Sequence, residues 1–231
     1  MTALKQDPPS YTIPPALTKR AQQKRALILA AAMRYFAEHG YEAARVGDIA
    51  ADLGIAKGSV FQHFGSKDGL FLEAYKDAVQ TLPGYLDVPA AIKEEGFFAV
   101  VRYRLHHADR LREQHDVQYK VMLLGNYGSD MNIKKRISRF LRHEDPLELK
   151  ALVRMGIERS EIRKDVDAEL VASFLESTLE RFQDSLLMAE HDPDLFHPHR
   201  DGNSKSREDH IEEFVRVLQG AIGSPQAAKT S

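Results

Sequence analysis

The sequence predicts an all-α protein built from a small N-terminal domain and a larger C-terminal helical domain. Through most of its 231 residues, apolar side chains recur at i, i+3, i+4 and i+7, which is the spacing of an amphipathic helix. No segment alternates apolar and polar residues as a half-buried strand does. Pro83, Gly84 and Pro89 interrupt the helical pattern, and we expect the boundary between the two domains there.

The N-terminal end is expected to be an arm followed by one long helix. Residues 1–17 contain four prolines and no apolar period, so we expect this arm to be disordered. A helix is expected over residues 18–39, and Gly40 is expected to end it because glycine tolerates a positive φ. The inner stripe of this helix consists of Ile28, Ala31, Ala32, Tyr35 and Phe36.

Residues 45–64 have the pattern of two short helices joined by a tight turn. The first helix presents an apolar face made of Val46, Ile49, Ala50 and Leu53, and Gly54 follows it. The second helix is expected to begin near Lys57, and its outer side carries small or polar residues: Gly58, Ser59, Gln62 and His63. A face of this kind fits the major groove of DNA, which is about 12 Å wide. The pattern also suits an ordinary corner between two helices.

A family resemblance runs from Arg25 to Leu70. The residues that carry it are Ile28, Leu29, Ala31, Ala32 and Phe36, then Gly40-Tyr41, Asp48-Ile49-Ala50, Gly54-Ile55-Ala56-Lys57-Gly58-Ser59, Phe61-Gln62-His63-Phe64, Ser66-Lys67 and Leu70. With these residues the chain resembles the TetR family of bacterial transcriptional regulators. It departs from the family at Ala44, where a Thr is common, and at Phe61, where a Tyr is usual.

The resemblance implies a domain organisation and a function. It places a helix-turn-helix DNA-binding domain at residues 22–82, with the motif at 45–64. A helical effector-binding and dimerisation domain is expected at residues 85–222, and a disordered tail at 223–231. The expected protein is a cytoplasmic regulator, a repressor by resemblance, that binds a palindromic DNA operator as a homodimer. A small-molecule effector of unknown identity is expected to release it.

Contacts with DNA are expected from the motif and from the start of the next helix. The residues are Arg45, Lys57, Gly58, Ser59, Val60, Phe61, Gln62, His63 and Lys67. Arg45 is expected to hold a phosphate because Ala44 supplies no hydroxyl. A helix is expected over residues 67–81, with Ser66 as its N-cap. Lys67 is unfavourable for the dipole in that first turn, so we expect it to hold a phosphate together with the helix N–H groups.

The charge is distributed unevenly along the chain. The formal net charge is −2, yet residues 16–68 carry 3 more basic than acidic side chains, and the remainder carries 5 more acidic than basic ones. This asymmetry is the one expected of a basic DNA-binding domain on an acidic body.

The C-terminal domain is expected to contain helices over residues 91–113, 116–127, 131–142, 146–160, 167–189 and 206–222. The last two have the clearest apolar stripes. Such stripes usually face the core of their own chain, but these can also pair with their copies across a twofold axis, as the resemblance implies. The residues expected at this dimer interface are Val171, Phe174, Leu175, Phe182, Phe214 and Leu218.

An aromatic and methionine set in the same domain is a candidate effector pocket. It comprises Phe97, Phe98, Tyr103, Tyr119, Met122, Tyr127 and Phe140. Ordinary core packing is the alternative for most of these side chains.

The sequence offers little chemistry of other kinds. It has no Cys, no Gly-rich phosphate loop and neither a GxSxG nor an HExxH motif, so we expect neither an enzyme nor a cofactor. No apolar run reaches about 18 residues and no apolar signal core begins the chain, so no membrane association is expected. A His- and Asp-rich patch could bind a divalent metal, but no metal site is expected in a loop without fixed geometry: His191, Asp192, Asp194, His197, His199, Asp201 and His210.

A second class of protein remains open. An all-α ligand-binding or scaffold protein could contain a helix-turn-helix that no longer reads DNA. The bare, partly basic surface from Lys57 to His63, together with Lys67, favours the regulator, because a scaffold has no use for it.

Overall fold

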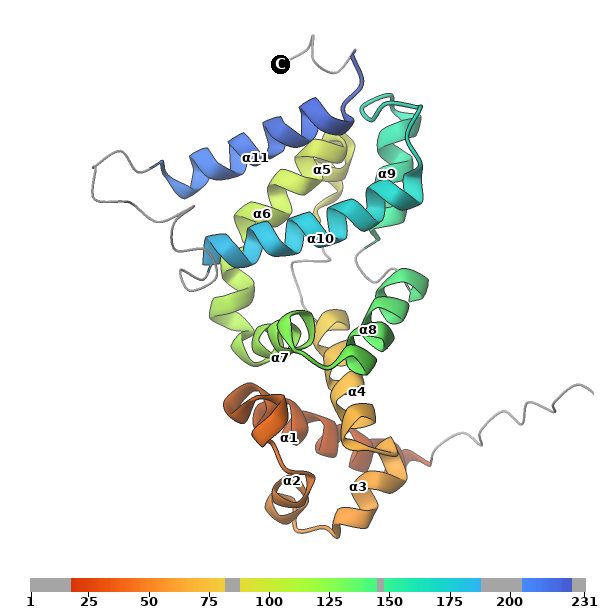
Figure 1. Ribbon diagram of the computed structural model, residues 1–231, viewed down its shortest axis with the longest axis vertical. Helices are drawn as coiled ribbons and strands as arrows, with labels where there is room; N and C mark the ends of the chain where they lie inside the picture. Colours follow the sequence, from red (N-terminus) through yellow and green to blue (C-terminus); the bar gives the residue numbers. More distant parts are fainter. Residues whose placement is uncertain (1–17, 82–87, 145–147, 188–204, 226–231) are drawn as a thin grey trace, which may run out of the picture.

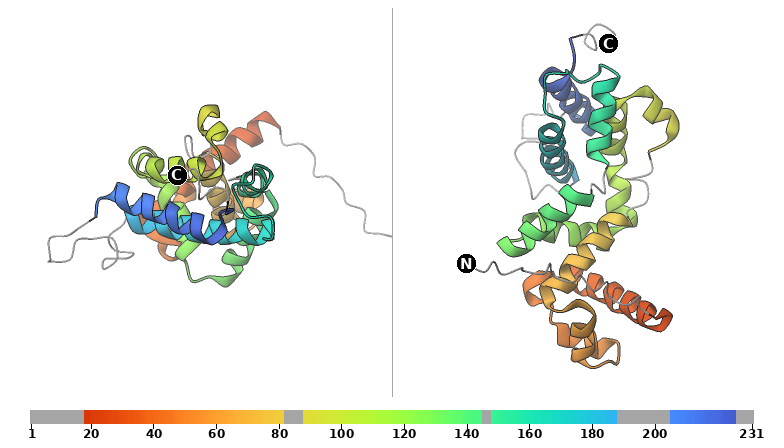
Figure 2. Two further views of the ribbon diagram at one scale, coloured as in Figure 1. Left: turned by 90° about the horizontal axis from the view of Figure 1, so that it is seen from above. Right: turned by 90° about the vertical axis from the view of Figure 1, so that its right-hand side faces the viewer.

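The computed structural model describes residues 18–81, 88–144, 148–187 and 205–225. Within these ranges the chain forms helices α1 to α11, and the only extended pairing is a single bridge between Ile162 and Gly223. The all-α prediction is therefore confirmed. Figures 1 and 2 show an elongated molecule with α2 and α3 at one end and α11 at the other.

The N-terminal domain is built from α1 (Lys19–Ala43), α2 (Val46–Asp52), α3 (Lys57–Phe64) and α4 (Lys67–Gln80). Its core includes apolar side chains that are at most 1% exposed, among them Ile28, Phe36, Ile49, Val60, Leu70 and Phe71. These residues come from all four helices, so the two short helices are held by the two long ones.

Two glycines give this domain its turns. Gly40 has φ 74° and interrupts α1 with a kink, after which one further helical turn continues to Ala43. Gly54 has φ 62° and ends the turn between α2 and α3, where the N–H of Ile55 donates to the Ala50 carbonyl at 2.9 Å. Side chains other than glycine are strained at such φ values, which is why a break could be predicted at both positions from the sequence. The predicted end of the first helix at Gly40 was wrong, because the helix resumes after the kink.

Helix α4 joins the N-terminal domain to the body. It packs against α1 on one side and against α7 (Asp116–Tyr127) and α8 (Met131–Glu144) on the other. Tyr75 in its middle is fully buried, and its hydroxyl donates to Asn126 Oδ1 of α7 at 2.8 Å. Gly125 allows this close crossing, because a Cβ there would lie 2.5 Å from the Tyr75 ring.

The first helix expected in the body is two helices, α5 (Ala90–Glu95) and α6 (Phe97–Gln114). Gly96 separates them with φ 115°, and a Cβ at this position would lie 2.4 Å from the carboxylate of Glu161. That carboxylate accepts the N–H of Phe97 at 2.8 Å. The prediction of a single helix over 91–113 was therefore wrong, because the break depends on a partner 64 residues away.

The remaining helices follow the predicted order. Helix α9 (Leu149–Glu158) is shorter than predicted at both ends, and α10 (Ala168–Leu187) and α11 (Arg207–Ile222) complete the body. Ser206 and Asp209 form the predicted capping box at the start of α11. The disordered tail was predicted to begin at residue 223. Ser224 is still part of the fold, because its N–H donates to the Glu161 carbonyl at 2.8 Å. The expected N-terminal arm lies outside the described residues.

Candidate nucleic-acid interface

Helix α3 presents most of its predicted DNA-contacting side chains to solvent. Lys57, Gly58 and Gln62 are exposed, and the side chains of Ser59, Phe61 and His63 are partly exposed. The prediction for Val60 was wrong, because its side chain is 1% exposed and packs into the domain core. Val60 lies on the inner side of a helix whose outer side was predicted correctly.

Gly58 is exposed without a steric reason within the chain. A Cβ added at this position meets nothing within 4 Å, and the φ of Gly58 is not positive. Glycine in a helix is less stable than alanine by roughly 0.5–1 kcal/mol. The absence of a side chain here leaves the α3 backbone open to a close approach from outside, as a major groove requires.

Arg25 of α1 fixes the C-terminal end of α3, a role that the sequence did not indicate. Its Nη1 donates to the His63 carbonyl at 2.9 Å, and its guanidinium lies 4.3 Å from the centroid of the Phe64 ring. Its Nη2 donates to Glu73 of α4. Arg25 therefore positions α3, α1 and α4 relative to one another. The sequence placed it only in a basic cluster, because its partners are 38 to 48 residues away.

Arg45 begins α2 and projects from the exposed surface. It occupies the N-cap position, where no side chain accepts a hydrogen bond from the helix, and the preceding Ala44 is buried. Asp48 in the first turn supplies the favourable negative charge. The exposed Arg45 guanidinium is suited to an anion such as a phosphate.

Lys67, at the start of α4, is engaged within the protein. Its Nζ donates to the Glu42 carbonyl at 3.0 Å and lies 4.6 Å from the centroid of the Tyr41 ring. Ser66 caps the helix as predicted, accepting the Gly69 N–H at 3.0 Å. A phosphate held by Lys67 must therefore compete with the Glu42 carbonyl.

The residues predicted to line an effector pocket are spread through the body. Phe97 and Phe98 pack edge to face, and Tyr103 stacks on His107. Tyr119 and Tyr127 do meet, since both hydroxyls donate to Asp184 of α10 at 2.7 Å. Phe140 instead packs against Tyr75, and Met122 is buried. The structure thus brings together only part of this set.

The residues predicted at a dimer interface divide into two groups. Val171, Leu175 and Leu218 are at most 5% exposed within the single chain, so they belong to its own core and their prediction was wrong. Phe174 is 44% exposed, and Phe182 and Phe214 are partly exposed and stack at 4.0 Å between centroids. Only the second group is available to a partner.

The candidate metal patch lies outside the described residues, apart from His210 on α11. Among the described residues, no group of three or more His, Cys, Asp or Glu side chains could hold a metal ion. The same residues contain no helix that is long and apolar enough to span a membrane.

A helix-turn-helix with an exposed second helix, braced on a separate helical body, is the arrangement expected of a DNA-binding transcriptional regulator. Residues 28–74 match the family described as bacterial regulatory proteins, tetR family. The chain is 30% identical over 169 residues to the HTH-type transcriptional repressor AcnR of Corynebacterium glutamicum, covering 67% of this chain and 77% of that one. This protein belongs to the TetR family.

Other relatives agree with this membership. The HTH-type transcriptional repressor KstR2 of Mycobacterium tuberculosis is 30% identical over 164 residues, covering 66% of this chain and 74% of that one. A tetR family transcription regulator from Shewanella sp. PV-4 has the same fold, with a TM-score of 0.62, 14% identity and coverage of 87% of this chain and 98% of that one.

Proposed function

We propose that this regulator is a repressor that binds a palindromic operator as a homodimer and is released by a small-molecule effector. The observation that carries the DNA-binding part is the exposed outer face of α3, with Lys57 and Gln62 around the open backbone at Gly58. The repressor part is supported by the relatives named as repressors. The site of action is the cytoplasm, where the DNA is.

The homodimer is supported by apolar side chains left uncovered on the last two helices. Leu170 and Phe174 of α10 are 69% and 44% exposed, and Val217 of α11 is 64% exposed. Uncovered apolar area of this kind on two neighbouring helices suits an isologous contact with a second copy. Two α3 helices about 34–36 Å apart would then enter successive major grooves.

The salt dependence of DNA binding tests the proposal. A palindromic duplex is first selected from a random pool, and its affinity is measured between about 50 and 200 mM salt. Because several phosphates are neutralised per protomer, the affinity should fall by orders of magnitude. Lys57→Gln should weaken binding and lower the salt slope by about 0.9 for each phosphate that is no longer neutralised.

Lys135→Gln is the matched control, because Lys135 is an exposed cation on α8 of the body. It should leave both affinity and slope unchanged. A flat salt response with every selected duplex would favour the alternative, a helical scaffold that does not read DNA.

The effector is expected to act through α4. This helix starts beside α3 and packs against α7 and α8, so a change in its tilt alters the separation of the two α3 helices in a dimer. Coupling of this kind is typically worth about 1–3 kcal/mol and must be reciprocal. An effector that weakens operator binding must itself bind less tightly when operator is present.

A further inference from the structure

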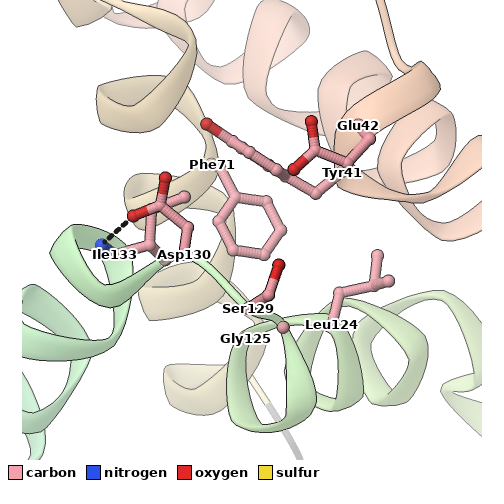
Figure 3. Close-up of a pocket in the computed structure, with 9 residues that line it drawn as sticks. Tyr41, Glu42, Phe71, Leu124, Gly125, Ser129, Asp130 and Ile133 are labelled. Carbon is pink, nitrogen blue, oxygen red and sulfur yellow. Dashed lines mark hydrogen bonds between the residues drawn. The ribbon is translucent and has the colours of Figure 1, made fainter.

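A cleft of about 160 Å³ lies between the DNA-binding domain and the body. Tyr41 and Glu42, at the end of α1, line the side of the DNA-binding domain, and Leu124 of α7 and Ser129 line the opposite side. Phe71 of α4 lies between them (Figure 3). The cleft therefore lies at the joint between the two domains and is not lined by the aromatic set expected to form a pocket in the body.

The size and walls of the cleft suit a compact apolar group. Phe71 is 1% exposed and Ile133 is 4% exposed, so the apolar walls are fixed by the surrounding core. An apolar cavity of about 150 Å³ is large enough to hold benzene. One small ring or a short branched alkyl group would fill this cleft.

The charges around the cleft are mainly negative. Glu42 and Asp130 line it, and Asp68 lies beside it, accepting the Tyr41 hydroxyl at 2.7 Å. Burial and this hydrogen bond raise the pKa of Tyr41, and the charges of Asp68, Asp130 and Glu42 raise it further. Among the described residues, Lys67 is the only cation in contact with Tyr41 and Glu42, through the Tyr41 ring and the Glu42 backbone carbonyl. The three carboxylates therefore outnumber the one ammonium group nearby.

The carboxylates differ in how far they are already satisfied. Asp130 Oδ1 accepts the N–H groups of Asn132 and Ile133 at 2.7 and 3.0 Å and so caps α8. The carboxylate of Glu42 makes no hydrogen bond or ion pair with any other described residue. It is therefore available to a cation that enters the cleft.

We propose that this interdomain cleft binds a small organic cation, an amine with a compact aromatic or aliphatic body. The apolar body lies between Phe71 and Leu124. The ammonium faces Glu42 and Asp130. Neutral and anionic molecules of the same shape lack these interactions.

Occupation of the cleft ties the two domains together, because its walls come from both. A bound amine favours the relative placement of the domains that keeps the walls at this separation. The consequence for operator binding rests on the proposed function, whereas the binding of the amine does not. If operator changes the affinity for the amine, the amine changes the affinity for operator by the same factor.

Three molecules of matched shape test the binding without DNA. Benzylamine, benzyl alcohol and benzoate are titrated against the full chain by ligand-observed nuclear magnetic resonance. Benzylamine should bind saturably and more tightly than the other two. Equal binding of the three, or no saturable binding of benzylamine, would overturn the proposal.

Conservative variants locate the site. Glu42→Gln and Asp130→Asn should each weaken benzylamine binding by about tenfold, the effect of removing one charge-assisted hydrogen bond. Asp130→Asn retains the helix cap, because Asn caps as well as Asp. Glu158→Gln, an exposed position on α9, is the control and should change nothing. The same affinity in all three variants would place the ligand elsewhere and overturn the proposal.

A steric variant and a DNA titration complete the test. Ser129 is exposed at the mouth of the cleft, so Ser129→Leu should fill the cleft without disturbing the core and abolish benzylamine binding. Benzylamine is then titrated with and without the selected duplex. Equal affinities overturn the coupling, whereas loss of DNA binding altogether overturns the proposed function and leaves the cleft site standing.

Discussion

Gly58 lowers the stability of α3 but keeps its outer surface free of a side chain. Nothing in the chain occupies the space of its missing Cβ. Gly58→Ala should raise the free energy of unfolding by roughly 0.5–1 kcal/mol, since alanine is the better helix former. The same methyl group should weaken operator binding by at least about tenfold, because it would meet the wall of the groove.

Gly220 offers the matched control for this prediction. It lies in α11 of the body, and an added Cβ there also meets nothing within 4 Å. Gly220→Ala should stabilise the protein similarly and leave operator affinity unchanged. Thermal unfolding measures the stability of each variant, and fluorescence anisotropy measures its affinity for operator. If Gly58→Ala binds operator as tightly as the unmodified protein, the outer face of α3 does not lie in the groove.

Glu180 on α10 makes stability depend on pH. Burial raises the pKa of this carboxyl to about 8, with the charges of Glu176 and Asp184 adding to the effect. In the unfolded chain the pKa is near its ordinary value of 4.5, so between 4.5 and 8 the folded state retains a proton that the unfolded state has lost. The contribution of Glu180 to the free energy of unfolding is therefore fully present below pH 4.5 and is lost as the pH rises through 8.

Glu180→Gln should remove this pH dependence, because glutamine resembles the protonated carboxyl. The variant should have a higher Tm than the unmodified protein at pH 8.5 and nearly the same Tm at pH 5. Glu158→Gln, at an exposed position, should show no such difference. An equal change in Tm at both pH values would contradict the shifted pKa.

Helix α10 carries two apolar faces that sequence periodicity cannot separate. Leu175 is fully buried in its own chain, whereas Phe174 beside it is 44% exposed. Leu175→Glu should unfold the protein, because it buries an unpaired charge. Phe174→Glu should leave the fold intact and produce a monomer.

Sedimentation and circular dichroism distinguish these outcomes. The Phe174→Glu variant should sediment as a monomer with unchanged helix content, and Leu175→Glu should lose helix content. A dimer that persists in Phe174→Glu would exclude this face of α10 as the interface.

The spacing of the DNA-binding domains in a dimer can be measured with spin labels. Because the chain has no Cys, a single introduced Cys is the only site that reacts with the label. A spin label on Arg34→Cys, at an exposed position on α1, reports the distance between the two DNA-binding domains of a dimer. We expect a broad distance distribution without DNA. Operator should narrow it, since both α3 helices must fit grooves about 34–36 Å apart.

A label on Glu158→Cys in α9 is the control for this experiment. Its distance distribution should stay the same with and without operator, because the body is expected to hold the dimer. If operator leaves the distance distribution of the Arg34→Cys label unchanged, DNA does not select one spacing of the two DNA-binding domains, and this prediction is wrong.

The local structure of the DNA-binding domain was determined by the sequence itself. Helix α3 begins at Lys57 as predicted, and α4 lies within one residue of its predicted bounds. Gly54 and the Ser66 cap act as predicted, and Gly40 has the predicted positive φ but kinks α1 instead of ending it. Each depends on backbone geometry and hydrogen bonds within a few residues. The exposed outer side of α3 follows from the same short-range period.

Only the tertiary structure decided which surface each apolar or charged side chain meets. It buried Val60 and Leu175, left Phe174 exposed, and broke the predicted first body helix at Gly96. It also assigned Arg25 to the support of α3. These outcomes depend on partners far along the chain, and periodicity identifies a face of a helix without identifying what packs against it.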